Sequence, residues 1–317
     1  MKPKIAISVG DLNGVGIELI LRAHKKVSRL CQPIYCINQD MLENASTLLD
    51  IKIPNDIKLH NTKGHFRIKP GSISKKSGQY SFDSFSDAIT LTKNKKTQAV
   101  VTLPINKESW NKANISYKGH TEVLRDIFNK NAIMMLGCSK MFVALYTEHI
   151  ALKKVPEKIQ VKPLTKFLID FYTCIKPDSK VAVLGLNPHA SDNGVLGDEE
   201  EKIIKAIKAA NKIINKKLKI KDLKNIFVGP QVPDTAFCKF NRNKYKYYVA
   251  MYHDQGLIPL KALHFDESIN VSLNLPIIRT SVDHGTAFDI AYKKTRKKIL
   301  SDKSYINAIK EAISLSQ

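Results

Sequence analysis

The sequence predicts an α/β protein with a mostly parallel sheet. Short apolar runs alternate with amphipathic helical stretches along the chain, and several of the runs are apolar at successive positions. Strands that are hydrophobic on both sides are typical of a parallel sheet whose two faces are covered by helices. The 317 residues are enough for two domains of ordinary size.

Strands are predicted where a short apolar run ends in polar or turn residues. In chain order these runs cover residues 5–9, 34–37, 99–103, 141–146, 181–186, 226–228, 247–251 and 269–273. Amphipathic spacing predicts helices over residues 15–26, 82–95, 164–172, 199–217 and 304–315. The fourth of these helices begins with acidic residues and ends with lysines, the order that the helix dipole favours. Residues 61–81 are rich in Lys, Gly and Ser and are interpreted as a long loop.

The formal net charge of +22 is compatible with a nucleic-acid-binding protein. However, only seven of the 51 basic residues are Arg, the residue that base and phosphate recognition favours. The lysines are spread along the whole chain, on the polar sides of the predicted helices. We therefore interpret the charge as a solvated surface and expect no nucleic-acid partner.

The composition favours a soluble protein of the cytoplasm. A hydrophobic content of 43% indicates a sizeable core, yet the apolar runs are far shorter than the roughly 20 residues of a membrane span. No apolar leader follows the first residues, so the cytoplasm is the expected compartment and no membrane partner is expected. The five cysteines form no C-x-x-C pair and are interpreted as reduced, mostly buried thiols.

Three of the nine histidines directly follow predicted strands. His149, His189 and His253 come after the runs that begin at residues 141, 181 and 247. Ligands of open α/β sheets bind beyond the carboxyl ends of the strands, and three neutral imidazoles leave a divalent metal open positions for a substrate. The placement therefore favours a metal site over three unrelated loop histidines. Histidines without such a placement are interpreted as surface or packing residues: His24, His60, His65 and His264.

Two further segments have the features of an anion site. Lys261, Asn270 and Arg279 follow His253 in the sequence and could form a clamp for a phosphate or carboxylate. His120 and Thr121 open a helical stretch, where free N–H groups and the helix dipole favour an anion. Each signal alone is weak, because a Lys on the surface, or a Thr that caps the N-terminus of a helix, needs no further function.

The glycine-rich turn at residues 8–18 leads from a strand to a helix. It fits neither the G-x-G-x-x-G dinucleotide pattern nor the G-K-[ST] of a P-loop. The sequence also contains no Ser nucleophile elbow and no H-E-x-x-H motif. Common nucleotide and hydrolase motifs therefore do not identify the protein.

Residues 251–257, Met-Tyr-His-Asp-Gln-Gly-Leu, together with residues 275–287, closely resemble the 4-hydroxythreonine-4-phosphate dehydrogenase family of pyridoxal phosphate biosynthesis. Residues 119–122, 186–190 and 229–235 also look like motifs of this family and occur in the same order. The resemblance spans nearly the whole chain. It departs from the usual pattern where Leu12 and Ile17 replace prolines and in the loop at Asn193, but neither change affects an expected ligand.

The resemblance implies a divalent metal ion, zinc, magnesium or cobalt, held by His149, His189 and His253. It further implies a homodimer with a shared active site, in which His253 comes from the partner subunit. Five residues are expected to hold the phosphorylated substrate: His120, Thr121, Lys261, Asn270 and Arg279.

The expected fold is similar to isopropylmalate dehydrogenase, with the active site in the cleft between two domains. One domain would combine residues 1–126 with 274–317, and residues 127–273 would form the other, carrying the metal ligands and dimer contacts. In those relatives a His-Gly-Ser/Thr-Ala turn lies at the cofactor. His284, Gly285 and Thr286 are therefore the expected contacts of NAD or NADP.

The implied reaction is oxidation of the C3 hydroxyl of 4-phosphohydroxy-L-threonine, followed by loss of CO2 to give 3-amino-2-oxopropyl phosphate. It needs a general base, for which Asp234, Asp254 and Lys261 remain open candidates. The nearest alternative is a paralogue that oxidises threonate or erythronate phosphate. A metal-dependent phosphohydrolase and a basic nucleic-acid-binding protein are more distant alternatives.

Overall fold

A computed structural model describes residues 2–218, 225–293 and 300–317. The chain divides into two compact units. Unit 1 comprises Met1–Ala132 and Ile269–Gln317, and unit 2 comprises Ile133–Ser268. The domain assignment expected from the resemblance has its limits at residues 126 and 274, whereas these units have theirs at Ala132 and Ile269.

Unit 1 is built on strands in the order β3-β2-β1-β4-β11-β10. Their bounds are β1 (Lys4–Ser8), β2 (Gln32–Cys36), β3 (Leu59–His60), β4 (Ala99–Thr102), β10 (Ile269–Leu273) and β11 (Ile278–Val282). All neighbouring strands in this order pair in parallel except β10 and β11, which are antiparallel. The helices are α1 (Gly16–Leu30), α2 (Gln39–Leu49), α3 (Lys75–Lys93), α4 (Lys107–Lys112), α5 (His120–Phe128) and α12 (Lys303–Leu315).

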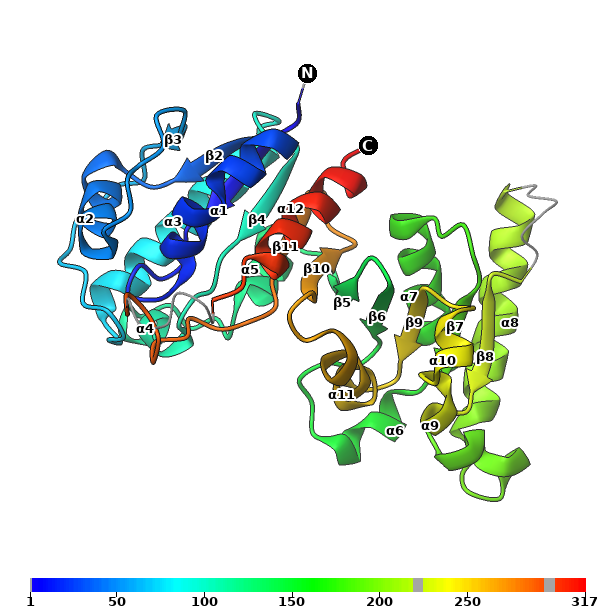
Figure 1. Cartoon of the computed structure of the whole chain (residues 1–317). Helices are drawn as coiled ribbons and strands as arrows, with labels where there is room; N and C mark the ends of the chain where they lie inside the picture. The colour runs from blue at the N-terminus through cyan, green and yellow to red at the C-terminus, as the bar shows by residue number, and fades with distance from the viewer. Residues whose placement is uncertain (1, 219–224, 294–299) are drawn as a thin grey trace. The chain divides into compact units, whose positions relative to one another are not determined.

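Helices cover both faces of the unit 1 sheet. Ala6 and Val100, which are register partners on β1 and β4, pack with Phe85 of α3 in one buried cluster. On the opposite face, the Thr280 hydroxyl of β11 donates to the carbonyl of Ala308 on α12 at 2.8 Å. In Figure 1, α1 and α12 lie side by side over these strands. The double cover explains why β1 and β4 are buried at nearly every position.

Unit 2 has strands in the order β5-β6-β9-β7-β8. Their bounds are β5 (Ile133–Cys138), β6 (Met141–Leu145), β7 (Val181–Leu184), β8 (Phe227–Gln231) and β9 (Tyr247–Ala250). β5 and β6 form an antiparallel hairpin, and β6, β9, β7 and β8 run parallel. The helices are α6 (Val155–Lys158), α7 (Val161–Ile175), α8 (Glu199–Leu218), α9 (Pro233–Ala236), α10 (Lys239–Arg242) and α11 (His253–His264), with short 3-10 turns η1 (Leu152–Lys154) and η2 (Pro188–Gly194).

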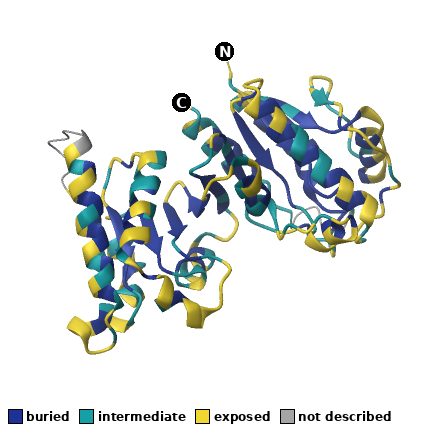
Figure 2. Cartoon of the chain, turned by 180° about the vertical axis from the view of Figure 1, so that it is seen from behind, coloured by how far each residue is buried: buried dark blue, intermediate teal, exposed yellow. Residues whose placement is uncertain are grey.

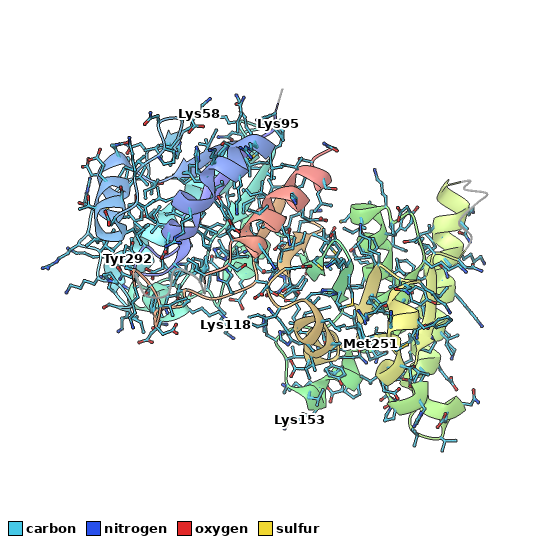
Figure 3. The ribbon with its side chains drawn as sticks, in the orientation of Figure 1. Lys58, Lys95, Lys118, Lys153, Met251 and Tyr292 are labelled. Atoms are coloured by element: carbon cyan, nitrogen blue, oxygen red, sulfur yellow. The ribbon has the colours of Figure 1, made fainter. Side chains whose placement is uncertain are left out.

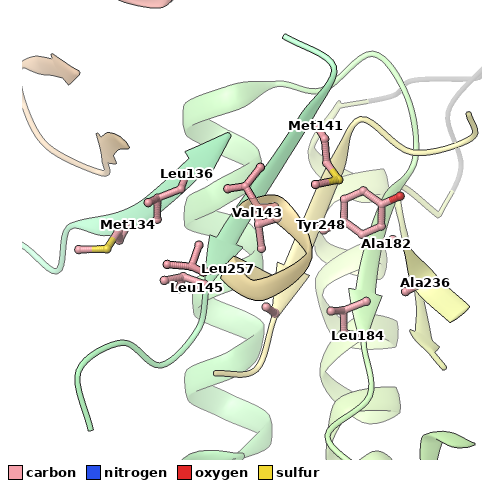
Figure 4. Packing of buried hydrophobic residues seen from close by; sticks show 12 residues of the cluster. Met134, Leu136, Met141, Val143, Leu145, Ala182, Leu184, Ala236, Tyr248 and Leu257 are labelled. Carbon is pink, nitrogen blue, oxygen red and sulfur yellow. The ribbon is translucent and has the colours of Figure 1, made fainter. Parts of the chain in front are cut away.

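Helix α11 packs directly on the unit 2 sheet. Its Leu257 belongs to the buried cluster that contains Val143 and Leu145 of β6 (Figure 4). Gly256 permits this close approach, because a Cβ at that position would lie 2.4 Å from Cγ1 of Val143. The helix that begins with His253 is therefore fixed against the strand that precedes His149.

The predicted fold class, α/β with mostly parallel strands, is confirmed. Figure 2 shows central strands that are buried, such as β4, β6 and β9, and helices that are buried along one side. The prediction of a loop over residues 61–81 is wrong for its last residues, because helix α3 already begins at Lys75. The Ser74 side chain caps this helix by accepting a hydrogen bond from the amide of Ser77. Strands β5 and β11 and helices α2 and α11 were not among the predicted elements.

The lysine-rich surface is visible in Figure 3, where Lys58, Lys95, Lys118 and Lys153 extend from the edges of the ribbon. All four are exposed. Cys31, Cys36 and Cys138 are buried free thiols, whereas Cys174 is partly buried and Cys238 is exposed. None of the helices in the described ranges combines the length and the apolar character that crossing a bilayer requires.

Candidate active site

Three neighbouring parallel strands of unit 2 end beside the predicted metal ligands. β6, β9 and β7 are adjacent in the sheet and run in the same direction, so their carboxyl ends lie along one edge. His149 follows β6, His253 follows β9 and His189 follows β7. The topology thus brings three loops, each with one histidine, to the same edge of unit 2.

The peptide of Met251, just after β9, connects these loops. Its carbonyl accepts hydrogen bonds from the Thr147 hydroxyl at 2.6 Å and the Thr147 amide at 3.2 Å. Its amide donates to Oε1 of Gln255 at 2.7 Å, and Nε2 of Gln255 donates to the carbonyl of Gly185, after β7, at 2.6 Å. Thr147 and Gln255 thereby fix the histidine loops through backbone atoms.

The loop before His189 is held by two acids at the start of α8. Oε1 of the buried Glu200 accepts hydrogen bonds from the amides of Leu186 and Asn187, both at 2.7 Å. The Asn187 side chain donates to Glu199 and to Glu200, each at 2.8 Å. The bond from Asn187 is the main cause that lowers the pKa of Glu199. His189 itself is exposed and has a left-handed backbone, with φ 52°.

His149 and His253 form a close pair, with ring centroids 5.5 Å apart. Two imidazoles that bind one tetrahedral zinc ion through bonds of about 2.0–2.1 Å have centroids roughly 5 Å apart. Nδ1 of His253 lies 2.6 Å from Oδ1 of Asp254, a contact that orients the ring and leaves Nε2 available to a metal. The nitrogen donors and the supporting carboxylate fit a divalent transition metal.

His189 does not complete a close ligand set within one chain. Across residues 2–218, 225–293 and 300–317, the His, Cys, Asp and Glu side chains that bring three ligand atoms within 4.8 Å of one another are those of Cys138, His264 and Glu267. The resemblance implied that His253 comes from a partner subunit, but here His253 lies beside His149 of its own chain.

In unit 1, Arg279 is a buried cation whose hydrogen-bond partners among the described residues are neutral hydroxyl groups. Its side chain donates to Oγ1 of Thr102 from Nε at 3.2 Å and from Nη2 at 2.7 Å, and to the Ser272 hydroxyl from Nη1 at 3.3 Å. No carboxylate in the described part of the chain pairs with it. Burial lowers the pKa of the guanidinium to about 9. An anion is the partner that this buried charge lacks.

His120 and Asn270 add polar atoms in the same unit. The His120 ring meets Phe85 edge-on, with centroids 4.5 Å apart, and Trp110 at 5.6 Å. Burial and, to a smaller extent, the charge of Arg279 hold the pKa of His120 well below its ordinary value, so the ring is neutral. Nε2 of His120 and Oδ1 of Asn270 are buried and have no hydrogen-bond partner among the described residues.

The shared face of the sheet explains why these groups are found together. Arg279 is the register partner of Val100, and Ser272 that of Arg279, so these side chains point to the face that α3 covers. Asn270, two residues before Ser272, points the same way, and His120 touches Phe85 on that face. Of the remaining expected substrate ligands, Thr121 is buried in the first turn of α5, whereas Lys261 belongs to unit 2, on α11.

The expected cofactor turn packs against the N-terminal glycine turn. The amide of Val15 donates to the carbonyl of Thr286 at 3.1 Å, and a Cβ on Gly14 would lie 2.8 Å from that same oxygen. In contrast, apart from the glycine and its two chain neighbours, no atom of the described residues lies within 4 Å of the Cβ position of Gly285. His284, Gly285 and Thr286 thus form a turn that is anchored at Thr286 and open at Gly285.

Comparison with known proteins identifies the family. The model of the family "Pyridoxal phosphate biosynthetic protein PdxA" matches residues 29–312. The chain belongs to the PdxA family. It is 60% identical over 316 residues to a 4-hydroxythreonine-4-phosphate dehydrogenase of Sulfurimonas denitrificans, covering 100% of this chain and 99% of that protein.

Further relatives agree with the PdxA assignment. A 4-hydroxythreonine-4-phosphate dehydrogenase of Campylobacter fetus is 57% identical over 314 residues, covering 99% of this chain and 98% of the relative. The crystal structure of the Klebsiella pneumoniae 4-hydroxythreonine-4-phosphate dehydrogenase matches with a TM-score of 0.81 and 29% identity, and covers 100% of this chain and 99% of that chain. The fold described above is therefore the fold of PdxA proteins.

Sequence reasoning missed several residues that support this candidate site. Thr102 and Ser272 bind Arg279, Glu200 holds the His189 loop, and Thr147 and Gln255 connect the strand ends. Gln255 lies within residues 251–257, the motif on which the resemblance rests. Its place in that motif could have indicated a role at the site. Glu200 was interpreted only as a charge at a helix N-terminus, because its contacts depend on the tertiary fold.

Proposed function

We propose that the chain catalyses the NAD(P)-dependent oxidation of 4-phosphohydroxy-L-threonine at C3, with decarboxylation to 3-amino-2-oxopropyl phosphate, in pyridoxal phosphate biosynthesis. The observation that carries the proposal is the 60% identity, over the whole chain, to a protein named for this activity. The buried Arg279 supports it, because a phosphorylated substrate supplies the anion that this cation lacks.

The phosphate site uses groups that are already in place. Arg279, held by Thr102 and Ser272, presents a fixed positive charge that favours a phosphate over a neutral substrate. Neutral His120 and Asn270 have unused polar atoms that can bind the same ligand. Because these groups are oriented before substrate arrives, little side-chain ordering opposes binding.

His149, His253 and His189 are the residues proposed to hold a divalent metal ion, and His284, Gly285 and Thr286 those proposed to contact NAD(P). When bound, the metal would supply Lewis-acid polarisation of the C3 oxygen, and the cofactor would accept the hydride. Asp254 contacts Nδ1 of His253 and acts as an orienting group, which leaves Asp234 and Lys261 as candidates for the base.

The reaction is tested with purified protein, a divalent metal salt and either NAD or NADP. Formation of NADH or NADPH with 4-phosphohydroxy-L-threonine, together with release of CO2, is the expected result. Threonate phosphate and erythronate phosphate serve as competing substrates. A clear preference for either one would replace the assignment with a paralogous dehydrogenase, and phosphate release without cofactor would indicate a hydrolase.

The division of metal ligands between two subunits is tested by mixing inactive variants. The His149–His253 pair within one chain supports a homodimer site in which His189 is the ligand from the partner. Mixing His149→Ala with His189→Ala should then restore activity, because one site of each mixed dimer has all three ligands. Mixing His149→Ala with His253→Ala should not. The reverse pattern would assign His253 to the partner.

The cofactor site is tested with Gly285→Ala. The added methyl group has open space, so the melting temperature should stay unchanged. If NAD(P) approaches this turn closely, the methyl group will raise the KM for the cofactor and leave the KM for substrate nearly constant. An unchanged cofactor KM would place NAD(P) elsewhere.

A further inference from the structure

A second group of metal-ligand side chains lies in unit 2. One ligand atom each from Cys138, His264 and Glu267 lies within 4.8 Å of the others. Cys138 is the last residue of β5, His264 is the last residue of α11, and Glu267 follows in the turn after this helix. Thiolate, imidazole and carboxylate are the three ligand types that bind zinc in proteins.

The backbone holds the three residues in place. Cys138 is the register partner of Met141 in the hairpin of β5 and β6, and its thiol is buried. The preceding Gly137 allows this tight hairpin, since a Cβ there would lie 2.1 Å from the carbonyl of Met141. After α11, the amide of Glu267 donates to the carbonyl of His264 at 3.2 Å. The ligands thus come from a rigid hairpin and a closed turn.

One neighbouring charge bears directly on metal binding. Nζ of Lys140 lies 3.1 Å from Oε2 of Glu267 and competes with a cation for this carboxylate. The Lys140 side chain is 64% exposed, so solvent can accept it when Glu267 turns to a metal.

We propose that Cys138, His264 and Glu267 form a zinc site, with water as the fourth ligand. The site shares no ligand with the proposed His149, His189 and His253 site. On binding, the thiol of Cys138 releases its proton to solvent as the sulfur–zinc bond forms. Helix α11 begins at His253 and ends at His264, so zinc at its C-terminal end would fix the helix that carries a proposed catalytic ligand.

Co2+ is a suitable probe, because a thiolate ligand gives a near-ultraviolet charge-transfer band that histidine ligands do not give. Metal-free protein titrated with Co2+ should develop this band. Cys138→Ser should abolish it, and Cys238→Ser, which changes an exposed cysteine outside the group, should retain it. His149→Ala should also retain the band, which separates this site from the proposed catalytic metal.

Two further variants guard against a folding defect in Cys138→Ser. Glu267→Gln changes a partly exposed side chain and should weaken the affinity for Zn2+ by more than about tenfold. Lys140→Met removes the competing charge and should strengthen it. If Co2+ gives no charge-transfer band, or if Lys140→Met leaves the affinity unchanged, the group is a structural ion pair beside a buried thiol and the proposal fails.

Discussion

At the scale of single residues, Arg279 shows how a binding site is prepared before its ligand arrives. Burying a guanidinium without a carboxylate is unfavourable, and the hydroxyls of Thr102 and Ser272 offset only part of this cost. A phosphate that binds here supplies the negative charge that the Arg279 guanidinium lacks. The residue therefore lowers the stability of the free protein and raises its affinity for an anionic substrate.

Replacing Arg279 with Lys should raise the KM for the phosphorylated substrate by roughly 10- to 100-fold, from about 1.5–3 kcal/mol for a charge-assisted hydrogen bond. Lysine keeps the charge but cannot match the guanidinium fork that binds Thr102 and Ser272 together. Steady-state kinetics measure the effect, and Arg29→Lys at an exposed position is the matched control. An unchanged KM for Arg279→Lys would place the phosphate elsewhere.

The lowered pKa of Arg279 also predicts a pH dependence. The guanidinium is charged below about pH 9 and loses its proton as the pH rises through that value. Competitive inhibition by inorganic phosphate, which carries no amine of its own, should therefore weaken above about pH 9. The inhibition constant measured across this range provides the test, and a constant value up to about pH 10 would contradict the assignment.

The lowered pKa of Arg279 has the opposite effect on folding. A rise in pH weakens anion binding but increases the stability of the folded chain. Between about 9 and the ordinary pKa of 12.5, the unfolded chain holds a proton that the folded chain has lost. The contribution of Arg279 to stability therefore improves as the pH rises through this window. Below about pH 9 both states are protonated, and the cost of burying the charge is fully present.

The sequence predicted Arg279 and Asn270 as anion ligands because they follow His253 in a specific motif. It did not identify Thr102, which lies far away in the chain. Thr102 reaches Arg279 only because β4 and β11 pair in parallel, with Arg279 opposite Val100. Local patterns contain no information on such a pairing.

At the scale of elements, Gln255 connects the first turn of α11 to two strand ends. Its side chain accepts from the Met251 amide after β9 and donates to the Gly185 carbonyl after β7. Both bonds run from the Gln255 side chain to backbone groups, so they fix the loops and leave the histidine nitrogens available. Gln255 is thus a positioning residue for the proposed metal ligands.

Gln255→Glu should weaken metal affinity by about 10- to 100-fold, as replacement of a residue that supports metal ligands commonly does. The carboxylate would keep the acceptor for Met251 but would face the Gly185 carbonyl without a proton to donate. Zn2+ titration with a competing chelator measures the change, with Cys138→Ser in all the proteins compared so that the second proposed zinc site does not contribute. Gln160→Glu, at an exposed position, is the control, and equal affinities of both variants would exclude the role.

Element prediction succeeded where the periodicity was strong and failed where turns decided the structure. Helix α11 was missed because it begins directly at His253 and has Pro259 inside, which a sequence pattern reads as a helix breaker. Helix α3 begins earlier than predicted because Ser74 provides a cap within a stretch that was interpreted as a loop. Strand β5 was missed although all its residues are buried.

At the scale of the whole molecule, the proposed ligand sites belong to different units. The groups around Arg279 lie in unit 1, and the three histidines lie in unit 2. A ligand that binds only the folded state stabilises it by about 2.7 kcal/mol at one hundred times its Kd. Each ligand should therefore stabilise its own unit most directly.

Hydrogen exchange can resolve this difference. Inorganic phosphate should slow exchange mainly in β4, β11 and α5. Zn2+ should slow it mainly in the segments after β6, β7 and β9 and, at the second proposed site, at the end of β5 and in the turn after α11. The Arg279→Lys variant should lose the first effect and keep the second. Uniform protection of the whole chain by either ligand would show that the two units respond as one body.

The Met251 peptide offers a practical way to observe the site. Its amide donates to Gln255 and its carbonyl accepts from Thr147, so a shift of any histidine loop alters its magnetic environment. The chain contains six methionines, and selective 15N-methionine labelling would give an NMR spectrum with few signals. The Met251 resonance would then report metal occupancy in solution without any attached dye or change of sequence.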